Sequence, residues 1–266
     1  MTKSKWLSKL MIALSLCFFY LPIIIMMVFS FNSSKSLTSW NGFSLRWYEQ
    51  LFRSRDVLSS VWTSLSVATI STIIATIVGT LSAIGLTKSK KVIREIILTF
   101  NELPILNPEI VTAIGLMLLF VFSGISLGYM TMLLAHITFS IPYVILAVMP
   151  KLRTLDPNLT DAAMDLGATP FQALTKVMLP QITPSIISAA LIDFTMSFDD
   201  FVISYFVSGN GVKNISMMVY TMSKRINPTI NALSTILVIV ITVILLLVNI
   251  VPALAVKGKQ NEKISG

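Results

Sequence analysis

Three acidic residues lie close together in an otherwise apolar segment toward the end of the chain. Residues 191–206 read LIDFTMSFDDFVISYF and contain Asp193, Asp199 and Asp200. Because a charged side chain at the centre of a bilayer costs about 2.5–3.5 kcal/mol, three carboxylates would be hard to retain on a lipid-facing helix. On a continuous helix Asp193 and Asp200 share a face, and Asp199 points about 100° away from Asp200. We expect the shared face to line a cavity, while Asp199 caps or braces a neighbouring helix.

Aromatic side chains are interleaved with these acids. They are Phe194, Phe198, Phe201, Tyr205 and Phe206. An ammonium group within about 6 Å of an aromatic ring gains roughly 0.5–2 kcal/mol, so acids and rings together suit an elongated polyammonium ion that must later be released. The candidate residues of such a substrate path are Asp200, Asp199, Tyr205 and Asp193. The alternative is that the acids form structural pairs with a partner helix, and both interpretations stay open.

The composition indicates the environment in which these acids lie. Hydrophobic residues make up 55% of the 266 residues, charged residues only 12%, and the mean hydropathy is +0.82. A soluble domain usually carries about 25% charged residues. So much apolar surface does not fit inside one water-soluble core, and the chain is therefore predicted to be an all-α, polytopic membrane protein. The single cysteine, Cys17, lies in an apolar run, which excludes disulfides and cysteine metal clusters.

Six segments are long and apolar enough to cross a bilayer as helices, which takes about 20 residues each. The predicted spans are about 8–31, 57–86, 104–123, 127–150, 183–206 and 229–253 in one permease-like domain, 1–266. Pro104 and Pro108 interrupt the start of the third span, and 92–103 fits an interfacial helix that leads into it. The first span is too long for a signal-peptide core and no cleavage site follows it, so we expect it to remain in the mature protein.

The basic residues predict the orientation in the membrane. The two termini, the segment 88–94 and the loop 151–182 together carry thirteen of the 20 Lys and Arg residues. Because cytoplasmic loops are enriched in Lys and Arg, both termini and this loop are predicted to be cytoplasmic. The same asymmetry explains the net charge of +8, so nucleic-acid binding is not expected.

The loop 151–182 carries the signals of two short helices. The residues that mark their ends are Asp156, Pro157, Gly167, Thr169, Pro170, Gln172, Leu179 and Pro180. Asp156 fits an N-cap with Pro157 at the first helical position, and Gly167 fits the left-handed residue that ends this helix. Thr169 and Gln172 form a capping box for the second helix, which Leu179-Pro180 is expected to close. A polar helix–Gly–helix hairpin at the membrane surface suits docking of a partner, although it is also compatible with an ordinary cytoplasmic loop.

The usual catalytic motifs are missing from the sequence. There is no phosphate-binding G-x-x-x-x-G-K-[ST], no H-E-x-x-H and no G-x-S-x-G. The only histidine, His136, lies in the fourth predicted span, where we favour a buried imidazole bonded to a neighbouring helix over a proton relay. We therefore predict no catalytic residue, no metal site and no cofactor in this chain.

The hairpin resembles a known signature, the EAA loop by which permease subunits of binding-protein-dependent ABC importers grip their ATPase. Asp161 stands where Glu is usual, and Val177 stands where Ile is usual. The resemblance implies that the ATPase is contacted by Asp161, Ala162, Ala163, Gly167, Val177, Leu179 and Pro180. It also implies that ATP and Mg are bound by that partner.

Other segments narrow the resemblance to one branch of this superfamily. They are SFNSS (30–34), SLRWYEQL (44–51), AHITFSIPYV (135–144), SFDDFVISYFVSG (197–209) and NALSTIL (231–237). Together they resemble the C-type permeases of spermidine/putrescine ABC importers, although Asp193 is not part of that pattern. The resemblance implies a six-helix, MetI-like permease in the bacterial plasma membrane. Its implied partners are a B-type permease, a cytoplasmic ATPase dimer and an extracellular polyamine-binding protein, working by alternating access.

Two other functions remain compatible with the residues. An ABC permease for another small cation, such as iron or an amine-containing vitamin, would also need acids in the fifth span. An ion-driven secondary carrier is the second alternative, and such carriers often contain inverted repeats. Residues 1–126 and 127–266 show no convincing repeat, and a carrier has no use for a wet docking hairpin.

Overall fold

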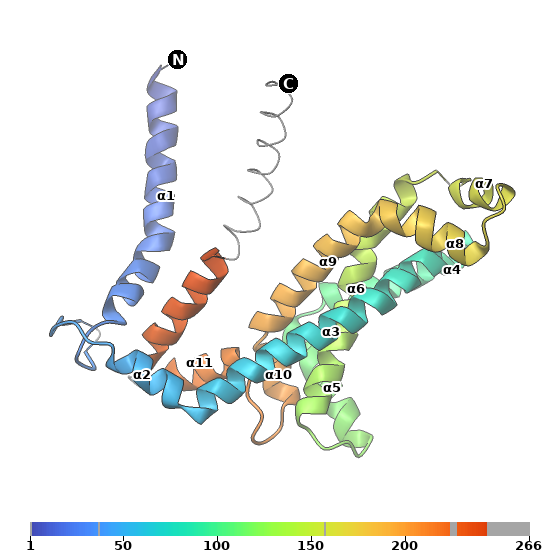
Figure 1. The fold of residues 1–266 in the computed structure, drawn as a ribbon. Helices are drawn as coiled ribbons and strands as arrows, with labels where there is room; N and C mark the ends of the chain where they lie inside the picture. The colour runs from blue at the N-terminus through green and yellow to red at the C-terminus, as the bar shows by residue number, and fades with distance from the viewer. Residues whose placement is uncertain (1, 37, 157, 224–227, 244–266) are drawn as a thin grey trace, which may run out of the picture. The chain divides into compact units, whose positions relative to one another are not determined.

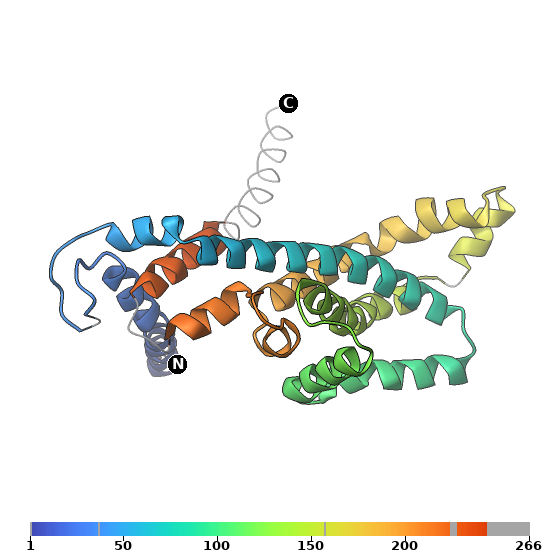
Figure 2. The same cartoon turned by 90° about the horizontal axis from the view of Figure 1, so that it is seen from below.

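The computed structural model describes residues 2–36, 38–156, 158–223 and 228–243 (Figures 1 and 2). The described residues are almost entirely helical, with one isolated antiparallel bridge between Asn32 and Phe43, which confirms the all-α prediction. The chain forms two compact units, residues 56–218 and residues 1–55 with 219–266. Four helices are long and apolar enough to cross a membrane, and a bent pair supplies a fifth span.

The smaller unit contains α1 (Thr2–Phe29), α2 (Arg46–Arg53) and the apolar helix Thr229–Val243. In α1 the apolar side chains from Trp6 onward are exposed, as expected of a helix that faces lipid or another chain. The last predicted span, 229–253, is described only as far as Val243, and its remainder lies outside the described residues.

The larger unit is built on α3 (Arg55–Thr87), α6 (Tyr129–Thr154) and α9 (Leu179–Asp199). The predicted segments 57–86 and 127–150 coincide with α3 and α6, while α9 begins before the predicted residue 183. Small residues let α3 approach α6 closely, because a Cβ atom added at Gly79 would lie 2.7 Å from the Cβ of Val144. The core between these helices contains Ala75, Ala83, Val144, Val148, Ile182 and Ala189.

The third predicted span is not one helix. It consists of α4 (Lys91–Leu106) and α5 (Glu109–Phe122), which meet at a bend of 105°. The bend lies at Asn107-Pro108, where Asn107 is extended with φ −78° and ψ 147°. Because proline disfavours the helical region for the residue before it, α4 ends there. The predicted start at residue 104 is therefore wrong, and the predicted leading helix 92–103 corresponds to α4.

The loop between α6 and α9 holds α7 (Leu159–Asp165) and α8 (Pro170–Gln172), seen at one end of the larger unit in Figure 1. Gly167 has a φ of +90°, as predicted for the residue that ends the first helix. The capping box is also confirmed. The amide N of Gln172 donates to the Thr169 hydroxyl (3.3 Å), and the amide N of Thr169 donates to Gln172 Oε1 (3.0 Å).

Both outer ends of this hairpin differ from the prediction. Asp156 is not the N-cap, because α7 starts only at Leu159; its Oδ1 instead accepts a hydrogen bond from the amide N of Asn158 at 2.9 Å. Pro157, the predicted first helical residue, lies outside the described residues.

Leu179-Pro180 does not close the second helix. A π-helical turn, Ala173–Met178, leads directly into α9, and the apolar helix runs on from Pro170 to Asp199. A π-helical turn is one of the local distortions that relieve the clash between a proline ring and the preceding turn, and it lets the helix continue through Pro180.

Candidate functional site: a broken helix and its polar network

The fifth predicted span, 183–206, is interrupted at Asp200. Helix α9 ends at Asp199, Asp200 is extended with φ −57° and ψ 130°, and α10 (Val202–Val207) follows. Asp193 and Asp200 therefore do not share a face of one helix, which corrects the sequence-based expectation. The difference arises because an acid in an apolar segment has two possible roles, and here Asp200 caps a new helix.

The carboxylate of Asp200 satisfies the first turn of α10. Its oxygens accept hydrogen bonds from the amide N of Ile203 (3.3 Å), the amide N of Ser204 (2.8 Å) and the hydroxyl of Ser204 (2.7 Å). The opening amides of a helix have no partner within the helix, so a capping carboxylate stabilises the start of α10. Only 6% of Asp200 is exposed.

His136, on α6, spans the break. Its Nδ1 lies 2.6 Å from the Ser197 hydroxyl on α9, and its Nε2 lies 3.0 Å from the Ser204 hydroxyl on α10. Nε2 is also 3.4 Å from Oδ2 of Asp200. The predicted bond from a buried imidazole to a neighbouring helix is confirmed, and the ring contacts both halves of the broken segment.

The polar network continues into two further segments. On α3, the hydroxyl of Ser71 lies 3.1 Å from that of Ser197. Before α11 (Ile215–Ser223), the Asn214 amide donates to the carbonyl O of Asp200 (2.6 Å) and to the Ser204 hydroxyl (2.9 Å). Because a buried polar group left without a partner costs about 1–3 kcal/mol, these bonds hold the break in one conformation.

The four predicted substrate-path residues fall into two pairs. The side chains of Asp193 and Asp200 are buried inside the larger unit, with 1% and 6% exposure. Asp199 is exposed, and Tyr205 is 52% exposed. The predicted brace at Asp199 involves its backbone, whose carbonyl O accepts from the Ser216 hydroxyl at 2.8 Å. Which of the four contacts a substrate stays a prediction.

Asp193 is the more isolated of the buried pair. Neither of its carboxylate oxygens has a hydrogen-bond partner among the described residues. The hydroxyls of Thr72 on α3 and Ser140 on α6 lie near it and are also unpartnered. These groups form a polar patch that is separate from the bonds around Asp200.

The sequence analysis did not single out Glu109, the first residue of α5. It lines a cavity of about 240 Å³ together with Asn107, Phe139, Tyr143, Met196 and Ile203, among others. Its carboxyl group lies beside that of Asp200 and within electrostatic range of Asp199. The available signal was an acid placed directly after Asn107-Pro108 inside a predicted span, where proline breaks the helix.

The predicted coupling residues lie on the hairpin and at its junction with α9. Asp161, Ala162, Gly167 and Pro180 are exposed, and Ala163, Val177 and Leu179 are partly buried. Two large apolar side chains that the sequence analysis did not single out also project from the hairpin, Leu166 (91% exposed) and Phe171 (72% exposed). Exposed apolar side chains on a polar hairpin indicate a surface that another protein covers.

These features define a class of protein. Long apolar helices, a span interrupted at a buried acid and an exposed helical hairpin are typical of the membrane subunit of a transporter. In the part of the chain that the structure describes, no three His, Cys, Asp or Glu side chains group as metal ligands.

Comparison with known families places the chain within that class. Residues 75–258 match the family described as "Binding-protein-dependent transport system inner membrane component", and the chain belongs to this family. It is thus a multi-pass transport subunit of the ABC permease type and not an enzyme, which sets aside the ion-driven carrier.

Two curated relatives confirm the predicted branch. The chain is 38% identical over 243 residues to the putrescine transport system permease protein PotI of Escherichia coli K12, covering 88% of this chain and 86% of that protein. It is 35% identical over 246 residues to the spermidine/putrescine transport system permease protein PotC of the same strain, covering 92% and 93%.

A solved structure has the same fold. A chain of the bacterial alginate ABC transporter, in complex with an alginate-bound periplasmic protein, superposes with a TM-score of 0.70. The superposition covers 92% of this chain and 93% of that chain at 17% identity, so the likeness concerns the fold alone.

Proposed function

We propose that this chain is the transmembrane subunit of an ATP-driven polyamine importer and forms half of its translocation path. The observation that carries the proposal is the acidic surface at the two helix breaks. Glu109 follows the bend between α4 and α5, and Asp199 precedes the break between α9 and α10. The names of the relatives PotI and PotC point to the same class of cargo.

The chemistry of this surface suits an organic polycation. Exposed Asp199 and the cavity-lining Glu109 offer carboxylates to ammonium groups, while the cavity wall includes the rings of Phe139 and Tyr143. Aromatic faces attract ammonium ions without holding them permanently, which favours release. Tyr205 is exposed near the same break and extends this surface.

The two buried acids have different roles in this proposal. Asp200 contributes negative potential to the path, but its oxygens are engaged in capping α10, so it mainly holds the break in shape. Asp193 lies on α9 near Thr72 and Ser140, away from the cavity beside Glu109.

The hairpin between α6 and α9 is the proposed contact with a cytoplasmic ATPase dimer, which would bind ATP and Mg. Leu166 and Phe171 would enter an apolar groove of that partner, beside Asp161, Ala162 and Gly167. A B-type permease would supply the other half of the path, and an extracellular polyamine-binding protein would deliver the cargo. The chain would lie in the bacterial plasma membrane with both termini in the cytoplasm.

Helix α9 gives a route for coupling by alternating access. It has 21 residues, equivalent to about 30 Å at 1.5 Å per residue, and joins the hairpin to the break at Asp200. Because the π-helical turn keeps α8 and α9 continuous, a displacement of the hairpin moves the far end of α9. The network of His136, Ser197 and Ser204 then transmits this movement to α6 and α10.

Transport in proteoliposomes tests the proposal. The chain would be reconstituted with its co-purifying partners and assayed for ATP-driven uptake of labelled spermidine, putrescine and an iron chelate, each with its loaded binding protein. ATP-dependent accumulation of a polyamine is expected. A complex that hydrolyses ATP and moves only another cargo would keep the transporter class and refute the polyamine assignment.

A further inference from the structure

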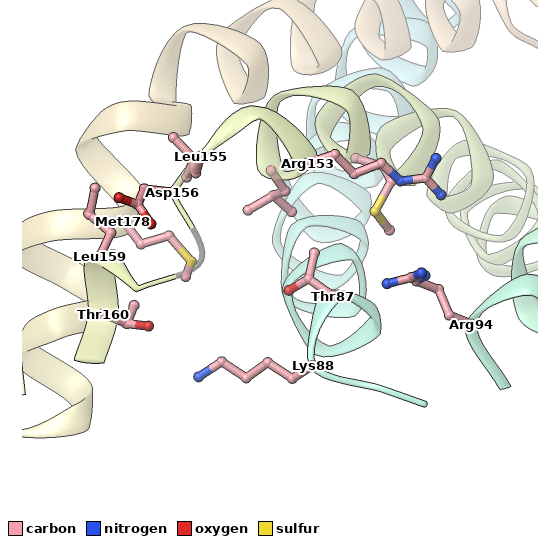
Figure 3. Close-up of a pocket in the computed structure, with 11 residues that line it drawn as sticks. Thr87, Lys88, Arg94, Arg153, Leu155, Asp156, Leu159, Thr160 and Met178 are labelled. Carbon is pink, nitrogen blue, oxygen red and sulfur yellow. The ribbon is translucent and has the colours of Figure 1, made fainter. Parts of the chain in front are cut away.

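A basic pocket lies at the other end of the larger unit, next to the hairpin (Figure 3). It has a volume of about 350 Å³, and three cationic side chains line it: Lys88 after α3, Arg94 on α4 and Arg153 at the end of α6. Figure 3 shows these side chains projecting from three different segments around one space, so tertiary packing brings them together.

The cations of the pocket are not neutralised by the described part of this chain. Lys88 and Arg153 have no carboxylate within ion-pair distance there, and Arg94 has only Glu95, whose Oε1 lies 3.7 Å from its Nε. The buried Nε of Arg94 has no hydrogen-bond acceptor in the same residues. The only acid that lines the pocket is Asp156, on the opposite side from Arg94 in Figure 3. The pocket therefore carries an excess of positive charge.

The remaining wall is apolar. Met149 and Leu152 of α6 and Met178 of the π-helical turn line the pocket beside the cations. Lys88 and Arg153 lie where the apolar helices α3 and α6 end, on the side of the membrane that collects most basic residues. At that depth a cationic site meets lipid headgroups, and the apolar wall meets the upper part of acyl chains.

We propose that this pocket binds the phosphate of an anionic glycerophospholipid, with phosphatidylglycerol as the test ligand. Arginine side chains bind phosphate oxygens in a bidentate manner and lysine adds a point charge, which matches Arg94, Arg153 and Lys88. Leu159 and Thr160, at the start of α7, line the same pocket, so a bound lipid would fix the hairpin against α6. Lipid occupancy would thereby tune coupling to the ATPase.

The test compares two double variants of the purified complex. Lys88→Gln with Arg153→Gln removes two pocket cations, while Lys91→Gln with Lys151→Gln removes two exposed cations that do not line the pocket. Binding of phosphatidylglycerol is titrated by native mass spectrometry after delipidation, with no cargo present. Each cation near the membrane surface is worth about fivefold in affinity, so the pocket variant is expected to bind roughly 25-fold more weakly.

Two further arms separate the alternatives. The charge-conserving pair Lys88→Arg with Arg153→Lys should bind within about threefold of the original, which shows that a folded pocket is being measured. Equal weakening in both neutral variants, or none in the pocket variant, would overturn the proposal. So would displacement of the lipid by inorganic phosphate at equal concentration, or lipid binding that appears only after the ATPase is removed. Because the titration needs no cargo, its result is independent of the polyamine assignment.

Discussion

Replacing Asp200 by alanine tests whether the break in the fifth span depends on its carboxylate. The change removes the acceptors for the amides of Ile203 and Ser204 and for the Ser204 hydroxyl. Loss of an N-cap costs about 0.5–2 kcal/mol, and a buried donor left unpaired costs about 1–3 kcal/mol. The free energy of unfolding should fall by roughly 3 kcal/mol, which corresponds to a fall of about 6–12 °C in the thermal midpoint.

Two control variants separate capping from charge. Asp200→Asn retains a capping oxygen and should lose less than about 1 kcal/mol, because asparagine and aspartate cap helices about equally well. It should leave assembly intact and impair uptake by removing negative potential from the path. Asp199→Ala removes an exposed acid and should change stability by no more than about 0.5 kcal/mol. Thermal unfolding of the purified complexes measures all three, and an Asp200→Ala complex as stable as Asp199→Ala would refute the capping argument.

Three further predictions use separate parts of the molecule. Gly167→Val should abolish co-purification with the ATPase, because φ of +90° disfavours a β-branched residue although no atom lies within 4 Å of its added Cβ; intact co-purification would contradict this. Glu109→Gln should raise the KM of polyamine uptake about tenfold, by loss of a charge-assisted bond, and unchanged uptake kinetics would exclude Glu109 from the path. Gly79→Ala should destabilise the α3–α6 contact by about 1–3 kcal/mol in thermal unfolding, and adding Val144→Ala should restore part of this; a stable single variant would show that the helices separate easily.

Local signals predicted much of the helical framework. The apolar segments 57–86 and 127–150 coincide with α3 and α6, because length and hydropathy are properties of each segment alone. The left-handed Gly167 and the capping box of Thr169 and Gln172 were also predictable, since these interactions join residues no more than a few positions apart. Leu179-Pro180 misled for the same reason: proline is a local stop signal, and the neighbouring π-helical turn lets the helix continue.

The candidate site was only partly predictable. Its acids were visible because charged residues are rare in apolar segments, but their roles were not. Asp200 fits a helix interior as well as an N-cap until His136 on α6 and Asn214 beyond α10 are placed against it. Glu109 was not singled out because its relevance depends on the 105° bend that brings it beside Asp200.

Sequence alone determined that this chain is an apolar helical membrane protein with a wet hairpin, and it indicated the correct transporter family. Composition and short motifs suffice for that, because burial in lipid and helix capping act residue by residue or turn by turn. Tertiary structure decided which acids are buried, where the fifth span breaks and how Lys88, Arg94 and Arg153 come to share one pocket. Those outcomes depend on contacts between residues far apart in the chain, whose free energies no local pattern contains.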